Sequence, residues 1–164
     1  IPNQFDDSEQ CIVLFDPNYI KVYPFETMIH HEVVNEMANG EGIMIAYCVL
    51  ANLGAVYTRK ICDRTLTFGV TGYTYFEEEI WGGLDAFVLW DRDTESLWWP
   101  LIDKAISGDL HGTKLEKYNE GNWETIRWGE IKERYPDAQV LKRGQTQDAP
   151  RNWPRINGQN LDCF

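Results

Sequence analysis

The chain has 164 residues, 43% of them hydrophobic and 13% aromatic, which is enough for one domain with a substantial core. Its formal net charge is −11, and nucleic acids and anionic membrane surfaces repel a protein of that charge. No apolar run approaches the roughly 20 residues that cross a bilayer, which argues against membrane insertion.

Turn signals divide the first two thirds of the chain into strands. Asp16-Pro17-Asn18 has the chemistry of a turn between two β-forming segments, and Asn39-Gly40 is a strong hairpin signal. A short helix is expected over residues 25–30, after Pro24. The segments 54–61 and 64–71 are expected to pair with each other. The predicted strands occupy residues 12–15, 19–23, 32–37, 42–50, 54–61, 64–71 and 85–90.

The last third changes character. Apolar residues at helical spacing predict a helix over residues 123–135, with Thr125 as its N-cap and Pro136 just beyond its end. Val140-Leu141 reads as a short strand, and the polar tail after it is expected to be anchored by Cys163. We therefore expect one strand-dominated α+β domain over residues 1–164, with extended segments at 1–10 and 144–164. Antiparallel hairpins would form a sheet or barrel-like core with two or three short helices.

The four cysteines, Cys11, Cys48, Cys62 and Cys163, are an even number and are compatible with two disulfides in three connectivities. A bond between Cys11 and Cys163 would tie both ends to the body and leave Cys48 with Cys62. The alternative is four free thiols, one of them functional. At least one disulfide is the favoured interpretation.

A polar cluster between tryptophans, at residues 90–98, is the first candidate site. Arg92 can hold a carboxylate through a bidentate pair, and Asp91 or Glu95 can act as general acid or base if burial raises its pKa. Trp90 and Trp98, with Tyr47 from an earlier strand, would line a ligand pocket. The alternative is a buried polar network that fixes a turn, with the tryptophans filling the core.

The second candidate is a metal site. His31 has the chemistry of a general base or a metal ligand, and Cys48 and His111 would complete a set suited to copper or zinc. The set rests on residue type, because no zinc-finger or His-Glu-x-x-His pattern is present. The alternatives are a histidine hydrogen-bonded into the fold and a buried structural cysteine.

Together these motifs resemble the family known as domain of unknown function 3179. Most of residues 22–141 matches in one order. The matching pieces are Val22-Tyr23-Pro24, His31-Glu32-Val33-Val34-Asn35, Tyr47-Cys48, Leu66-Thr67-Phe68-Gly69-Val70-Thr71-Gly72, Asp91-Arg92-Asp93-Thr94-Glu95-Ser96-Leu97-Trp98, Ala105-Ile106-Ser107-Gly108, and an ending with Trp128, Tyr135-Pro136-Asp137 and Val140-Leu141.

Two features depart from the family pattern. The family commonly shows Tyr-Cys-Pro-Leu-Cys, whereas this chain has Tyr47-Cys48-Val49-Leu50-Ala51, so a dithiol at this place is lost. The chain also carries an acidic, tryptophan-bearing insertion at residues 77–83. This insertion is either a lid over a site or an exposed loop.

The resemblance implies an exported, secreted or periplasmic protein, and the start at Ile1 fits either a cleaved mature form or a shortened chain. Three functional interpretations stay open. The first is a domain that binds a small ligand or metal ion in the tryptophan-walled pocket. The second is an enzyme that uses this pocket for acid–base chemistry on a small anionic substrate. The third is a disulfide-stabilised structural or interaction domain.

Overall fold

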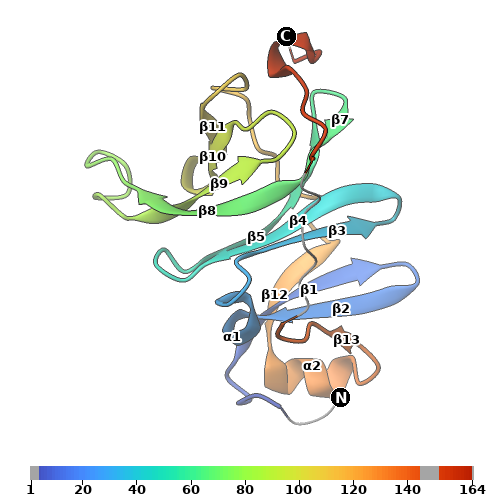
Figure 1. Cartoon of the computed structure of the whole chain (residues 1–164). Coiled ribbons are helices and arrows are strands. Elements are labelled where there is room, and N and C mark those ends of the chain that lie inside the picture. Colours follow the sequence, from blue (N-terminus) through green and yellow to red (C-terminus); the bar gives the residue numbers. More distant parts are fainter. Residues whose placement is uncertain (1–3, 145–151, 164) are drawn as a thin grey trace.

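The computed structural model describes residues 4–144 and 152–163, and in this part of the chain three sheets lie one above another (Figure 1). The lower sheet has the spatial order β12 (Trp123–Arg127), β1 (Gln10–Asp16), β2 (Tyr19–Pro24) and β13 (Gln139–Val140). The central sheet has the order β3 (Val33–Ala38), β4 (Glu41–Cys48) and β5 (Leu53–Thr58). The upper sheet has the order β11 (Lys104–Ser107), β10 (Leu97–Trp99), β9 (Ala86–Asp91) and β8 (Phe68–Tyr75). The other elements are α1 (Phe25–Met28), α2 (Trp128–Arg134), the ribbon of β6 (Lys60–Ile61) and β7 (Arg64–Thr65), and the 3-10 helices η1 (Pro100–Ile102) and η2 (Gly158–Asn160).

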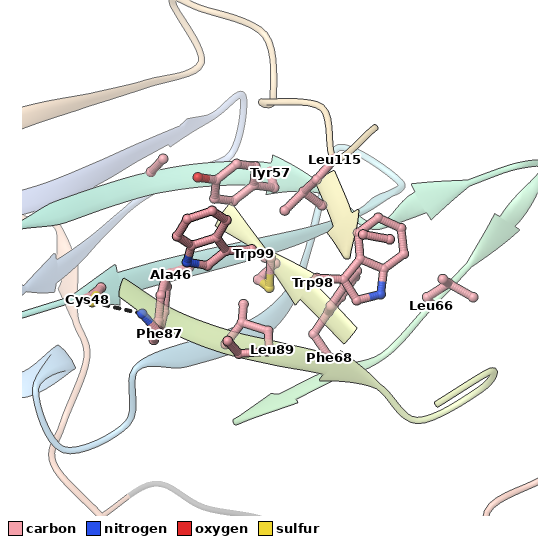
Figure 2. Close-up of a cluster of buried hydrophobic side chains, with 14 of the residues drawn as sticks. Ala46, Cys48, Tyr57, Leu66, Phe68, Phe87, Leu89, Trp98, Trp99 and Leu115 are labelled. Carbon is pink, nitrogen blue, oxygen red and sulfur yellow. Dashed lines mark hydrogen bonds between the residues drawn. The ribbon is translucent and has the colours of Figure 1, made fainter. Parts of the chain in front are cut away.

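Strand β4 is covered on both faces, because successive side chains of a strand point to opposite sides of its sheet. One set packs with Ile12, Leu14 and Tyr23 of the lower sheet, and the other packs with the upper sheet, including Phe68 and Trp98 (Figure 2). The β4 residues of these two sets are Ile43, Ile45 and Tyr47, and Met44, Ala46 and Cys48. Burial on both faces explains why this segment reads as a continuous apolar run.

Strand β1 repeats the arrangement one layer below. Its Ile12 and Leu14 face the central sheet, whereas Cys11 and Val13 pack with Trp128 of α2. The order of layers is therefore α2, lower sheet, central sheet and upper sheet. Among the described residues, none of the helices has the length and apolarity to cross a membrane.

The structure confirms a strand-dominated fold of antiparallel hairpins with two short α-helices in the part described. The predicted hairpins around 16–18 and 39–40 are β1–β2 and β3–β4. The sheets stay open and stacked, so the barrel-like variant does not apply. Residues 1–3, 145–151 and 164, which belong to the predicted terminal segments, lie outside the described residues.

The predicted pairing of residues 54–61 with 64–71 is wrong except at its tip. β5 pairs with β4 and β8 pairs with β9, and only the short ribbon β6–β7 and a backbone bond from Leu66 to Arg59 at its base join the two segments. The ribbon turns at Cys62 and Asp63, which both have positive φ values. Each long strand goes to a different layer because the chain passes from the central to the upper sheet here.

The predicted helix over residues 123–135 is wrong in its first part. Residues Trp123–Arg127 form β12, which pairs with β1 and covers its open edge, and the helix begins at Trp128. Thr125 lies opposite Ile12 in this ladder and is not an N-cap. Tertiary pairing has overridden a local helical spacing: Trp123 and Ile126, three residues apart, face opposite sides of the strand.

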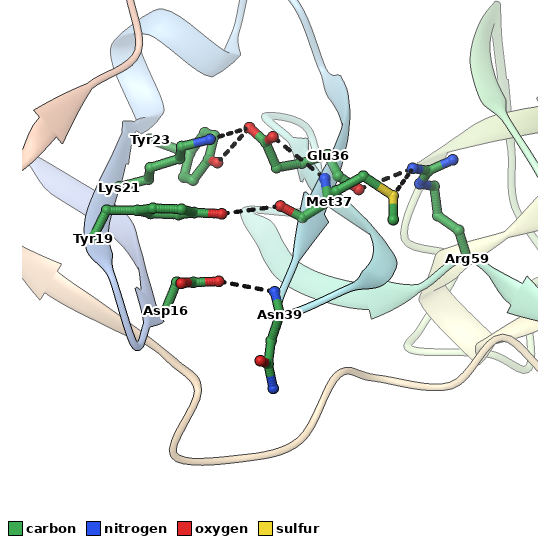
Figure 3. A network of polar contacts seen from close by, with 8 residues as sticks. All are labelled: Asp16, Tyr19, Lys21, Tyr23, Glu36, Met37, Asn39 and Arg59. Atoms are coloured by element: carbon green, nitrogen blue, oxygen red, sulfur yellow. Dashed lines mark hydrogen bonds and ion pairs between the residues drawn. The ribbon is translucent and has the colours of Figure 1, made fainter.

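Arg59, directly after β5, is a buried cation that joins two strands of the central sheet to the segment before β8, and its side chain appears at the edge of the network in Figure 3. Its guanidinium donates to the backbone carbonyl oxygens of Ile43 at 2.8 Å, Leu66 at 2.8 Å and Glu36 at 2.9 Å. Burial lowers its pKa, while the charges of Asp93 and Glu36 oppose that shift. All three nitrogens of the planar fork are thus used.

We expect Arg59→Lys to lower the free energy of unfolding by roughly 3 kcal/mol, because one ammonium cannot reach all three carbonyl groups and leaves buried acceptors unpaired. Chemical denaturation measures the change. The matched control is Arg64→Lys, at an exposed position on β7, which should shift stability by less than about 0.5 kcal/mol. Equal effects of the two substitutions would contradict the role given to Arg59.

Candidate functional site

The predicted polar cluster at residues 90–98 is a turn built around the buried carboxylate of Asp91. One oxygen, Oδ1, accepts from the Thr94 amide at 2.6 Å. The other, Oδ2, accepts from the Thr94 hydroxyl at 2.8 Å and from the Trp98 indole N–H at 2.9 Å. Burial raises the pKa of Asp91, and these hydrogen bonds partly oppose the shift.

The rest of the turn continues this network. The Thr94 and Ser96 hydroxyls lie 2.8 Å apart, and the Ser96 hydroxyl accepts from the Leu110 amide at 3.1 Å. The Asp91 amide donates to the Ser96 carbonyl, which closes the turn. The cluster therefore has the geometry of the alternative named from the sequence, a buried polar network that fixes a turn.

Arg92 and Glu95 point away from Asp91 toward the segment 152–163. The Arg92 guanidinium packs over the Trp90 ring at 5.0 Å and over the Trp153 ring at 5.8 Å. Glu95, which is exposed, forms an ion pair with Arg155. Asp93 receives the Ile156 amide on its carbonyl oxygen. The charges at this turn thus bind the C-terminal segment.

The aromatic residues expected to share a pocket lie on opposite sides of the central sheet. Tyr47 packs toward the lower sheet, stacks on Phe25 with ring centroids 4.1 Å apart, and donates its hydroxyl to Asn52 at 3.1 Å. Trp98 is fully buried toward the upper sheet, edge-on to Phe68. Trp90 is half-buried beside Arg92. The three rings do not wall one cavity.

The four cysteines form one disulfide, between Cys62 and Cys163, while Cys11 and Cys48 are free and buried. Cys163 anchors the tail as predicted, but the pairing of Cys11 with Cys163 is wrong. Cys11 faces α2 below the lower sheet, whereas Cys62 lies on the β6–β7 turn that the tail reaches. The positions of the four cysteines along the chain do not indicate in which layer of the fold each one lies, so they could not predict the pairing.

The structure does not assemble the predicted metal ligands His31, Cys48 and His111. Cys48 is buried, with its sulfur accepting from the Phe87 amide at 3.4 Å (Figure 2). His31 lies in the turn between α1 and β3, where its Nε2 accepts from the Gly144 amide at 3.1 Å. His111 is exposed in the turn after β11. Among residues 4–144 and 152–163 no three His, Cys, Asp or Glu side chains are grouped so that they could hold a metal.

The predicted catalytic residues likewise have separate partners. Asp91 is occupied by internal donors of the upper sheet, Glu95 pairs with the tail, and His31 bonds the backbone that follows β13. Arg92 stacks on tryptophan and does not hold a carboxylate in the described geometry.

A pocket that the sequence did not indicate lies where the lower and central sheets meet, with a volume of about 340 Å³. Within it the Lys21 ammonium lies 3.0 Å from a Glu36 carboxylate oxygen, and the Tyr23 hydroxyl donates to the same carboxylate at 3.3 Å (Figure 3). We call it the β2–β3–β13 pocket. Its lining residues are Lys21, Val22, Tyr23, Val34, Glu36, Gln139, Val140 and Leu141. They come from three segments that have no common motif, so no local sequence signal pointed to them.

One comparison with known proteins gives a match. A family model described as "Protein of unknown function (DUF3179)" matches residues 2–155 of the 164. The chain belongs to the DUF3179 family. No curated protein and no solved structure matches it. The resemblance noted from the motifs is therefore confirmed, and for this DUF3179 chain any function has to be argued from its own geometry.

The two free thiols of this DUF3179 chain should be inert in the native protein. Burial raises the pKa of Cys11 to about 12, and Cys48 is almost fully covered. With iodoacetamide at pH 8, we expect mass spectrometry to find no labelled cysteine natively, two in denaturant and four after reduction. Rapid native labelling of Cys48 would restore it as a nucleophile or metal ligand.

Asp91 should matter for stability, and Glu95 should not. Asp91→Asn replaces one acceptor oxygen by a donor facing the Trp98 indole, so we expect a loss of about 1–3 kcal/mol. Glu95→Gln breaks an exposed ion pair and should cost less than about 1 kcal/mol. Urea denaturation of both variants measures the difference, and an equal loss in both would contradict the network.

The pH dependence gives a second measurement on Asp91. Its raised pKa means that the native state holds this proton more tightly than the unfolded chain does. Its contribution to the free energy of unfolding is therefore largest below the ordinary value of 3.8 and falls as pH rises through the raised pKa. Asp91→Asn should remove this acid-range slope, and an unchanged slope would contradict the assignment.

Proposed function

We propose that this DUF3179 domain binds a small organic ligand with an apolar body and a zwitterionic head group in the β2–β3–β13 pocket. The observation that carries the proposal is the Lys21–Glu36 pair in a pocket that is also lined by the apolar side chains of Val34 and Leu141. A volume of about 340 Å³ lies at the lower end of the range usual for small-molecule sites.

The charged pair supplies both signs needed to orient a zwitterion. Its two side chains are about one quarter exposed, and an ion pair that solvent reaches contributes little to stability. A bound carboxylate can therefore replace Glu36 as the partner of Lys21, while a bound ammonium pairs with Glu36 and the Tyr23 hydroxyl keeps its own bond to that carboxylate. Exchange of partners keeps every charge compensated.

The apolar side chains that line the pocket determine the chemistry of the uncharged part of the ligand. Val34 and Leu141, which pack between the lower and central sheets, line the same pocket beside the Tyr23 ring, and each methylene group buried against them contributes about 0.8 kcal/mol. An amino acid with an aliphatic or thioether side chain matches both halves. We propose this pocket in place of the tryptophan-walled site and its copper or zinc ion, because the residues expected to form that site do not share one cavity.

We also propose that the protein works outside the cytoplasm. The Cys62–Cys163 disulfide supports this, since disulfides persist in oxidising compartments. The buried state of Cys11 and Cys48 agrees with it, because neither free thiol is open to oxidation or exchange.

The test is ligand-observed NMR and thermal shift on the purified chain with leucine, valine, methionine, aspartate and lysine. We expect the three apolar amino acids to bind. Lys21→Met should weaken leucine at least tenfold, because one charge-assisted hydrogen bond is worth about 1.5–3 kcal/mol. It should not weaken isopentylamine, which lacks the carboxylate and pairs with Glu36 alone.

Val34→Phe, which fills the pocket, should abolish binding, and Val49→Phe is the matched control at an exposed loop position. Binding that survives Val34→Phe would place the ligand elsewhere. Failure of the whole panel to bind, with folded protein, would refute the zwitterion proposal.

A further inference from the structure

A second surface lies on the upper sheet, in the arm formed by residues 70–85 at the end of β8 and the loop to β9. Figure 1 shows this arm extending away from the stacked sheets. Large aromatic side chains stand in solvent along it: Tyr73 is 76% exposed, Trp81 73% and Phe76 52%. Single exposed apolar residues are ordinary, but three aromatic rings on one short arm mark an interaction site.

The arm is tied to the core at its base. The Tyr75 ring packs edge-on against the buried Trp99 with centroids 5.0 Å apart, and its hydroxyl donates to Glu77 at 3.0 Å. Two tight turns follow, closed by bonds from the Ile80 amide to Glu77 and from the Gly83 amide to Ile80. The arm thus presents its aromatic rings from a fixed base, which lowers the entropic cost of binding.

The charge of the arm has one sign. Residues 70–85 contain Glu77, Glu78, Glu79 and Asp85 and no lysine, arginine or histidine. Two arms placed face to face would bring these carboxylates together, so a second copy of this chain is disfavoured, as is an anionic membrane. A cationic partner satisfies the carboxylates and also stacks on Trp81 and Tyr73 through cation–π contacts.

The backbone of β8 is the third feature of the arm that favours binding of a partner, after its aromatic rings and its acidic side chains. β8 is the last strand of the upper sheet, and from Val70 to Tyr75 its ladder among the described strands is with β9 alone, interrupted by a bulge between Val70 and Thr74. An edge strand with open backbone groups accepts another extended strand. The earlier half of β8 is closed instead by Asn35, whose side-chain amide makes both backbone bonds of Phe68.

We propose that this arm docks an extended, lysine- or arginine-rich segment of another protein. The segment adds to the β8 edge, its basic side chains meet Glu77, Glu78 and Glu79, and its apolar side chains lie on the rings of Trp81 and Phe76. The insertion at residues 77–83 is then a docking element and not a lid. This inference is independent of the β2–β3–β13 pocket, which lies between the other two sheets.

The test uses the full chain and a fluorescent peptide of alternating lysine and valine, with a glutamate–valine peptide of equal length as control. Fluorescence anisotropy should show binding of the basic peptide alone, weakening as salt is raised. Trp81→Ala, and separately Glu77→Gln combined with Glu78→Gln and Glu79→Gln, should each weaken binding at least tenfold. Leu50→Ala, at an exposed loop position of the central sheet, and Glu133→Gln on α2 are the matched controls.

Equal binding of both peptides, or equal affinity in the arm and control variants, would overturn the proposal. So would the absence of any binding by the basic peptide. Self-association in sedimentation experiments that disappears in Trp81→Ala would also overturn it and assign the arm to a second copy. Circular dichroism of each variant shows that the fold is kept, which is expected because the substituted residues are exposed.

Discussion

The structure depends on a central strand, β4, that is buried on both faces. Such a strand needs an apolar layer above and another below, and the lower and upper sheets supply them. Two side chains join the central sheet to the chain above it. Arg59 donates to the carbonyl oxygens of Ile43 in β4, Glu36 in β3 and Leu66 just before β8. The side-chain amide of Asn35, on β3, bonds the backbone amide and carbonyl of Phe68 at the edge of the upper sheet. A cation and an amide thus link the central and upper sheets.

Local chemistry made the hairpins predictable, whereas pairing between distant segments did not follow from it. Asn39-Gly40 and the turn at 16–18 determine which strands meet, because a two- or three-residue turn leaves little choice of partner. No turn of that kind relates β12 to β1, which are more than 100 residues apart. The spacing of Trp123 and Ile126 is that of a helix, and only pairing with β1 makes the segment a strand. The failed pairing of 54–61 with 64–71 has the same origin. The turn at Cys62 is present, but β5 before it pairs with β4 in the central sheet, and β8 after it pairs with β9 in the upper sheet.

The candidate site illustrates why residue type is a weak guide to chemistry. An aspartate, a threonine, a serine and a tryptophan are what an active site needs, and they are equally what a buried turn needs to satisfy its polar groups. The distinction lies in geometry: all three acceptor positions used on Asp91 face donors of the same turn or of Trp98. The β2–β3–β13 pocket shows the opposite case, in which residues without any sequence signal come together in a cavity. Lys21, Glu36 and Leu141 look unremarkable in sequence, and the cavity arises because three segments meet.

The course of the last third of the chain accounts for residues that resembled catalytic groups. β13 joins the lower sheet, and the Gly144 amide that follows bonds to His31 at the start of the central sheet. The segment 152–163 then covers the turn of the upper sheet through Trp153, Arg155 and Ile156 and ends at the disulfide to Cys62. Every layer is therefore bonded to this part of the chain. In the chain-entropy model, a loop of 101 residues closed by that disulfide destabilises the unfolded state by about 4–5 kcal/mol. His31, Arg92 and Glu95 serve as attachment points for this segment.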